Sequence, residues 1–510
     1  MFLGEQGDGQ SITTLHASFP TKLHDSSHCR QVDTFSRDDN FDKVSTPVAG
    51  LHNALSPLFP TAYLAAKPHM TLALADPRSA ALTNLGSMYA QGLGVPQDFG
   101  QALQCYESAA MRGQAQAQAN LGVMHAHGQG VPQDFASAAR WYEAAAEQGE
   151  PAAQSRLAVF YANGTGVEQD FERARALYEQ AAAQGDPLAH ANLGIMFANG
   201  QGVAPDPERA RNHLTQGAAS GESAAQYGMG VLSAQQQPPD WVHAQDWYTR
   251  AAEQGHVRAQ FNLGHLYSAA TGPARDFDQA LHWYGKAAAQ GDPAAHYNLG
   301  VMYGSGTGVP RNPAQAAEHY RVAAGLGEVS AQFNLGVMAL LGEGMEQDFG
   351  QALAWFGQAA EQGDAAAQLQ MGVLIANGQG TQANAEVACQ WLQLAANQGD
   401  ANAWFNLGQL HQRDQPGGPR LPQALAAYRA AAVMGFAPAQ AALGWMYAKG
   451  DGTLQDFVKA HMWFNIAAAG GNAAGVEGRE FVAARMSAQH IAQAQDLARE
   501  AQKNNLQGYD

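Results

Sequence analysis

The chain has 510 residues, more than a single compact hydrophobic core usually holds, so several domains or a repeat array are expected. It carries 28 Lys and Arg against 45 Asp and Glu, which gives a formal net charge of −17. This acidity, without any clustered basic run, argues against a nucleic-acid partner and against docking on an anionic membrane surface.

The N-terminal segment differs in composition from the rest of the chain. Residues 1–50 are rich in Ser, Asp, His and Gly with little apolar periodicity, which is typical of a disordered tail. Residues 51–75 are more apolar and could form an N-terminal cap for the segment that follows, although their prolines restrict any helix there to a short one.

Neither a secretory signal nor a membrane span is readable in the sequence. No basic region followed by an apolar stretch occurs at the N-terminus or after Met70, an alternative start. No segment approaches the roughly 18 consecutive apolar residues of a membrane span. We therefore expect a cytoplasmic protein without membrane insertion, with the periplasm as the alternative if the true start of translation lies elsewhere.

A repeat of 36 residues occupies residues 76–472. The dipeptide Leu-Gly or a close variant marks each copy, at Leu85, Leu121, Leu157, Leu193, Met229, Leu263, Leu299, Leu335, Met371, Leu407 and Leu443. Successive marks lie 36 residues apart, except that Met229 and Leu263 are separated by 34. The pattern therefore gives eleven copies, one of which has lost two residues.

The second copy shows that each unit is a pair of helices. A first helix over residues 115–127 places Leu121 on an apolar face with helical spacing. Gly128 is expected to end this helix, because glycine accepts the left-handed conformation of a helix C-terminus. Asp134 is then expected to cap the N-terminus of a second helix, whose Trp141 and its neighbours fill the core. Such a pair buries little apolar surface alone, so neighbouring copies must stack.

The cysteines give no sign of a disulfide framework, a metal site or a cofactor. Cys29, Cys105 and Cys389 are far apart, and no CxxC or Cys/His zinc spacing occurs. Cys105 occupies the position that Trp141 holds in the second copy, so we expect a buried and inert thiol there.

Residues 473–510 do not continue the repeat and are expected to form a C-terminal helical cap with a short tail. Two helices broken near Met486 and Ser487 are predicted, with Ser487 as the N-cap of the second. Apolar residues of this segment can cover the last copy, as the end of a solenoid requires. They are Phe481, Met486, Ile491, Ala494 and Leu497.

The repeat pattern A-x-A-x-x-x-L-G-x-M-Y-x-x-G-x-G-V-x-x-D-x-x-x-A-x-x-W-Y-x-x-A-A-x-Q-G resembles the Sel1-like repeat, a relative of the tetratricopeptide repeat. The resemblance covers about 400 of the 510 residues. It implies an all-α fold, an α/α right-handed superhelical solenoid, that serves as an adaptor or scaffold. Cysteine-rich relatives linked to β-lactam binding carry paired cysteines in each repeat; this chain lacks them, so that activity is not transferred.

Two columns of residues on the first helices are candidates for a partner-binding groove. The resemblance implies that the helix face carrying the residue before Leu-Gly lines a concave groove. Amides there could bond a peptide backbone, and neighbouring aromatic rings could add apolar contact. Packing between repeats is the alternative role for both columns. Over repeats five to ten, the candidates are Asn262, Asn298, Asn334, Asn406, Phe261, Tyr297, Phe333 and Phe405.

The sequence favours a binding protein over an enzyme. It contains no GxSxG, Walker A or HExxH motif, and its 18 histidines are scattered. We expect a bacterial scaffold or regulator that binds a partner peptide or domain. The alternative is a cell-envelope factor that binds glycan or assists a membrane complex; a hydrolase would require a polar constellation outside the repeat pattern, and none is seen. The partner's identity and the oligomeric state stay open.

Overall fold

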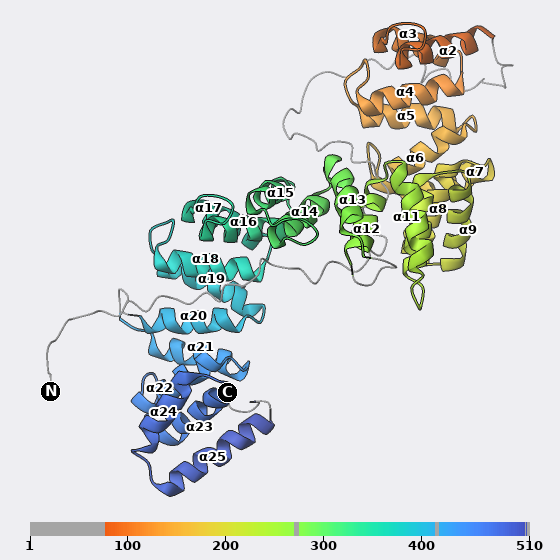
Figure 1. Ribbon diagram of the computed structural model, residues 1–510. Coiled ribbons are helices and arrows are strands. Elements are labelled where there is room, and N and C mark those ends of the chain that lie inside the picture. The colour runs from red at the N-terminus through yellow and green to blue at the C-terminus, as the bar shows by residue number, and fades with distance from the viewer. Residues whose placement is uncertain (1–76, 270–274, 414–417, 505, 507–510) are drawn as a thin grey trace. The chain divides into compact units, whose positions relative to one another are not determined.

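The computed structural model describes residues 77–269, 275–413, 418–504 and 506, and these residues form helices and no strand (Figure 1). The predictions of a disordered tail at 1–50 and a cap at 51–75 therefore fall outside the described residues. The chain divides into two compact units, whose boundary lies between Ala287 and Ala288.

The unit that ends at Ala287 contains consecutive pairs of helices, in which we call the first member helix A and the second helix B. The pairs are α2 (Pro77–Gln91) with α3 (Phe99–Ala110), α4 (Ala115–His127) with α5 (Phe135–Ala146), α6 (Pro151–Asn163) with α7 (Phe171–Ala183), α8 (Pro187–Asn199) with α9 (Pro207–Ala219), α10 (Ser223–Ala234) with α11 (Trp241–Glu253), and α12 (Val257–Ser268) with α13 (Phe277–Ala289), whose last two residues follow the boundary.

The unit that begins at Ala288 continues in the same way. Its pairs are α14 (Pro293–Ser305) with α15 (Pro313–Gly325), α16 (Val329–Leu341) with α17 (Phe349–Glu361), α18 (Ala365–Asn377) with α19 (Ala385–Asn397), α20 (Ala401–Gln412) with α21 (Leu421–Val433), α22 (Ala437–Lys449) with α23 (Phe457–Ala469), and finally α24 (Ala473–Ala483) with α25 (Ala488–Lys503). The all-α class built from tandem helix pairs is thus confirmed.

The local signals read from the second repeat position its helices as expected. Gly128 follows α4 with a φ of 67°, and its N–H donates to the carbonyl of Met124. Asp134 caps α5, since its carboxylate accepts a hydrogen bond of 3.0 Å from the N–H of Ser137. Both ends of the connecting loop are therefore fixed by residues of the repeat itself.

The glycine of the Leu-Gly pair is required by close packing of helix A against helix B. A Cβ added to Gly122 would lie 2.5 Å from the ring of Tyr142, and one added to Gly336 would lie 2.6 Å from the ring of Phe356. Real Cβ atoms do not approach so closely, so the missing side chain makes room for an aromatic ring. This contact explains why Leu-Gly recurs with the period of the repeat.

Glutamines form a hydrogen-bonded ladder, in which a buried glutamine of helix A bonds an exposed glutamine near the end of helix B. The Gln118 amide donates to the carbonyl of Ala110 in the preceding repeat at 3.4 Å, and Gln148 donates to Gln118 at 2.6 Å. These bonds satisfy polar groups that would otherwise be costly to bury. The same Gln–Gln bond recurs between Gln184 and Gln154, Gln254 and Gln226, Gln362 and Gln332, and Gln398 and Gln368.

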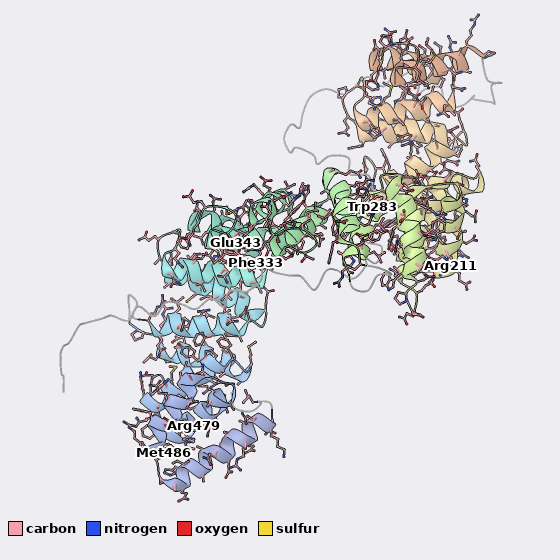
Figure 2. The ribbon with its side chains drawn as sticks, in the orientation of Figure 1. Arg211, Trp283, Phe333, Glu343, Arg479 and Met486 are labelled. Atoms are coloured by element: carbon pink, nitrogen blue, oxygen red, sulfur yellow. The ribbon has the colours of Figure 1, made fainter. Side chains whose placement is uncertain are left out.

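The last two helices cover the end of the final repeat. Ser487 caps α25 by accepting a hydrogen bond from His490, as predicted from the sequence. Met486, in the bend before α25 (Figure 2), and Leu497 pack against the core formed by α21 to α23. Phe481 stays partly exposed and contacts the ring of Trp445.

Candidate partner-binding surface

The predicted asparagine column lies on helices A but is largely interior. Asn334 and Asn406 are fully buried, and Asn262 has only 7% of its surface exposed. Asn298 is half-buried and is the most accessible of the four. Burial of three of the four asparagines supports the packing role that the sequence left open.

Two of these asparagines bond to their own helix. The Asn298 amide donates to the carbonyl of Ala294 at 2.9 Å, and the Asn406 amide donates to the carbonyl of Asn402 at 2.9 Å. A side chain that bonds the carbonyl four residues earlier is directed along its helix. Binding by this column stays a prediction, and accessibility favours Asn298 for it.

The predicted aromatic column forms part of the core between helices A and B. Phe333 is 1% exposed (Figure 2), while Tyr297 and Phe405 also have less than a tenth of their surface accessible. Each ring meets an aromatic ring of helix B at a centroid distance typical of favourable aromatic pairs. The distances are 5.7 Å for Phe261 and Tyr284, 5.8 Å for Tyr297 and Tyr320, 5.5 Å for Phe333 and Phe356, and 5.6 Å for Phe405 and Tyr428.

An open face occurs instead on helices A of repeats two and three. On α4, Gln116 and His127 are exposed, while Asn120 and Val123 are half-buried. The Gln116 amide lies 3.4 Å from the side-chain oxygen of Asn120, so the two amides form one polar strip. The family resemblance predicted a groove on this helix face, but it could not tell which repeats leave the face accessible, because burial depends on neighbouring helices.

The open face continues on α6, where Arg156 is exposed and Val159 is half-buried. Arg156 hydrogen-bonds the hydroxyl of Tyr142, whereas burial of that tyrosine raises its pKa to about 12. In the preceding repeat, Asn120 bonds the hydroxyl of Tyr106 in the same way. The residues at this position therefore join a buried tyrosine to the accessible surface.

A small pocket lies between α5, α6 and the loop after α6. Its volume is about 200 Å³, and it contains charges of both signs, from Arg140 and Glu143. Tyr161 lines one side, and Arg173 donates a hydrogen bond of 3.1 Å to the Tyr161 hydroxyl. The pocket can accommodate a single side chain of a partner rather than a larger ligand.

Two classes of site are missing from the part of the chain that the structure describes. Over these residues, no group of three or more His, Cys, Asp or Glu side chains is arranged to hold a metal ion. None of the described helices has the length and apolar character needed to cross a bilayer. Cys105 is buried and Cys389 half-buried; both are free thiols, and burial raises the pKa of each.

Comparison with known proteins agrees with this architecture. The Sel1 repeat model matches residues 79–114, 115–150, 151–186, 187–222, 223–256, 257–292, 293–328, 329–364, 365–400 and 437–472, which cover more than half of the chain. The chain belongs to the Sel1 repeat family. Proteins with such repeats are generally protein-interaction scaffolds.

Two solved structures illustrate the likeness. A protective antigen of uropathogenic Escherichia coli is 30% identical, with a TM-score of 0.63 over 84% of this chain and 92% of that one. A Sel1 repeat protein of Oxalobacter formigenes is 31% identical over 68% of this chain and 99% of its own, with a TM-score of 0.46. No curated protein sequence gives a significant match.

Residues 401–436 form a helix pair although the Sel1 repeat model does not match them. In this Sel1-like pair, Trp404 replaces the ladder glutamine and Ala427 replaces the usual tryptophan of helix B. Trp404 packs in the cluster that contains Ala427, so a large and a small side chain have exchanged places. This copy keeps the fold while departing from the family pattern, and the family model matches ten of the eleven copies.

Proposed function

We propose that this chain is a protein-interaction scaffold that holds a peptide segment of a partner on the open helix A faces of repeats two and three. The observation that carries the proposal is the accessible strip formed by Gln116, Asn120, Val123 and His127, which continues to Arg156 and Val159. Two amides beside small apolar groups suit a peptide, whose backbone needs both donors and acceptors.

The chemistry of this strip limits the strength of binding. Each amide hydrogen bond contributes roughly 1 kcal/mol net. The two valines are already half-buried, so covering the rest of each adds about 1 kcal/mol. The two amides and the two valines together contribute about 4 kcal/mol, which corresponds to a millimolar complex, so a partner that binds more tightly must make further contacts.

Repeat seven offers a second accessible point on the predicted groove. Asn298 and Val301 are both half-buried there, at the positions that Asn120 and Val123 occupy in repeat two. We propose Asn298 as a contact residue. The more deeply buried candidates, such as Asn334 and Phe333, support the helices that present such contacts.

The test is capture of partners from the host by the full chain, compared with an Asn120→Arg, Val123→His variant. Arginine and histidine already occupy these positions in repeats three and six, as Arg156 and His265, so the variant is expected to fold. We expect at least a tenfold loss of a specifically captured partner. The matched control is Ala183→Arg on an exposed position of α7 outside the pocket, which adds the same arginine charge and should retain that partner.

Equal capture by both variants would contradict a site on the open face of repeats two and three. Purified partner and chain would then be titrated by calorimetry to obtain the dissociation constant for each variant. A partner that binds all forms equally would place the contact elsewhere, with Asn298→Arg as the next variant.

A location in the cell envelope is the second candidate, and one observation favours it. The Escherichia coli protein, which is 30% identical and matches over 84% of this chain, is described as a protective antigen. Fractionation of the host with an antibody to the chain decides between this location and the cytoplasm predicted from the sequence.

A further inference from the structure

Two histidines face each other between α8 and α9 in repeat four. The Nδ1 atoms of His190 and His213 are 3.1 Å apart, and their ring centroids are 5.3 Å apart. His190 is 8% exposed, and the ring of Phe197 stacks on that of His213. The pair therefore lies at the edge of the core, between the two helices of one repeat.

The same arrangement recurs between α14 and α15 in repeat seven. There the Nδ1 atoms of His296 and His319 are 3.2 Å apart, with ring centroids at 5.4 Å. Tyr303 stacks on His319 as Phe197 stacks on His213. Two repeats in different compact units thus contain the same cluster of one aromatic and two imidazole rings.

In these two repeats, two positions of the repeat pattern change to histidine together. The first histidine occupies the position of the ladder glutamine, and the second occupies the position of the core tryptophan in helix B. Both columns change to histidine in repeats four and seven, and neither does in the other nine. The glutamine near the end of helix B that completes the ladder is also missing, being Ser220 in repeat four and Leu326 in repeat seven.

The hydrogen bonds of the first histidine leave a lone pair directed at the second. His190 bonds the carbonyl of Ala182, and His296 bonds the carbonyl of Ala288. A neutral imidazole has one N–H, and its two nitrogens point in different directions. The nitrogen that faces the partner histidine is therefore the acceptor. A backbone carbonyl that fixes the tautomer in this way is the usual support of a histidine that ligates a metal.

The separation of the nitrogens matches two ligands of one zinc ion. Zinc binds histidine nitrogens at about 2.0–2.1 Å in tetrahedral geometry, which places two such nitrogens about 3.3–3.4 Å apart. The observed 3.1 and 3.2 Å differ from this by a few tenths of an ångström. To admit the ion, each ring must turn by about 35° so that its Nδ1 lone pair points at the ion instead of at the other nitrogen.

The charge state of the pairs also suits a metal. Burial lowers the pKa of all four histidines, so their imidazoles are neutral at pH 7. Around the first pair, Asp186 raises the pKa of His190 and Arg209 lowers that of His213. Around the second, Asp292 acts on His296 and Glu318 on His319, and both raise the pKa.

We propose that each histidine pair binds one Zn²⁺ ion between its two Nδ1 atoms, with water completing the coordination. On binding, the proton on Nδ1 of the second histidine moves to its other ring nitrogen, so the pair stays neutral. The ion joins helix A to helix B within repeat four and, separately, within repeat seven. With two protein ligands each, these are exchangeable sites that stabilise the repeat when zinc is present.

The test is a calorimetric titration of the full chain with ZnCl₂ at pH 7.5. We expect two zinc ions per chain that depend on the pairs. The variant His190→Gln, His213→Trp should remove one, and His296→Gln, His319→Trp should remove the other. The variant with all four substitutions should bind neither of these zinc ions. Weak zinc binding by other histidines should be the same in the natural chain and in every variant.

These variants restore a combination that the fold already packs. Repeat eleven holds Gln440 and Trp463 beside the aromatic Tyr447, at the positions of His190, His213 and Phe197. Thermal unfolding gives a second readout, since zinc should raise the Tm of the natural chain by several degrees and leave the fourfold variant unchanged. Equal zinc uptake and an equal zinc effect on Tm in all folded forms would overturn the proposal and leave the pairs as hydrogen bonds only.

Discussion

Helices α4 and α16 share a nearly identical central segment but bury it differently. Residues 117–124 and residues 331–338 differ only at Ala119 and Phe333. Asn120 and Val123 remain partly accessible in α4, whereas every residue from 331 to 340 is buried. The repeat pattern thus fixes which face of helix A is oriented away from helix B, and the neighbours determine whether that face is surface or core.

Repeat eight also has larger side chains than repeat two on this helix. Phe333 and Leu340 stand where repeat two has Ala119 and Ala126. They form one cluster with Phe356 and the next repeats, and all of these side chains are buried. Bulk at these two positions is not the sole cause of burial, because repeat four buries Asn192 and Ile195 with Ala191 and Ala198 at the same positions.

The largest expected effect tests the core side of this comparison. Phe333→Ala removes a fully buried ring and should lower the free energy of unfolding by about 3–5 kcal/mol. Val123→Ala, on the open face, should cost about 1 kcal/mol or less. Urea unfolding followed by circular dichroism measures both, and equal losses would contradict the contrast between the two helices.

A smaller effect should be shared by both repeats. In Gly122→Ala and Gly336→Ala the new Cβ meets an aromatic ring at 2.5 and 2.6 Å. Each substitution should therefore destabilise the chain by about 1–3 kcal/mol through overpacking. The same unfolding experiment applies. If only Gly336→Ala is destabilising, helix A of repeat two does not pack closely on its helix B.

The smallest effect is a dependence of stability on pH, expected from the histidine pairs of repeats four and seven but not from repeats with glutamine and tryptophan at those positions. Burial lowers the pKa of His190, His213, His296 and His319 below the ordinary value near 6.5. Their neutral forms stabilise the folded state above pH 6.5, and this contribution is lost as the pH falls through 6.5 towards the lower folded values. Without zinc, the natural chain should lose more Tm between pH 7.5 and 5.5 than the fourfold Gln and Trp variant. If Tm falls equally with pH in the natural chain and in the fourfold variant, the four histidines are not the source of the pH dependence.

The sequence predicted the repeat architecture well because its signals are local and recur. Gly128 and Asp134 occupy the predicted ends of the loop, and Ser487 caps the last helix as expected. The candidate site was harder to predict, because the accessibility of Asn298 against Asn334 depends on packing between repeats. The two histidines of each pair are 23 residues apart in the sequence, which matches no metal-binding motif. They could have been found by aligning the repeats and noting that two positions change to histidine together.

The helix A face is accessible in repeat two and closed in repeat eight, and this contrast can be tested directly. Its most direct test is thiol labelling of Asn120→Cys and Asn334→Cys in a background with Cys29, Cys105 and Cys389 replaced by Ala. We predict that the folded Asn120→Cys variant reacts within a few-fold of an unfolded control, and that Asn334→Cys is protected at least a hundredfold. Similar rates for the two folded variants would contradict the account.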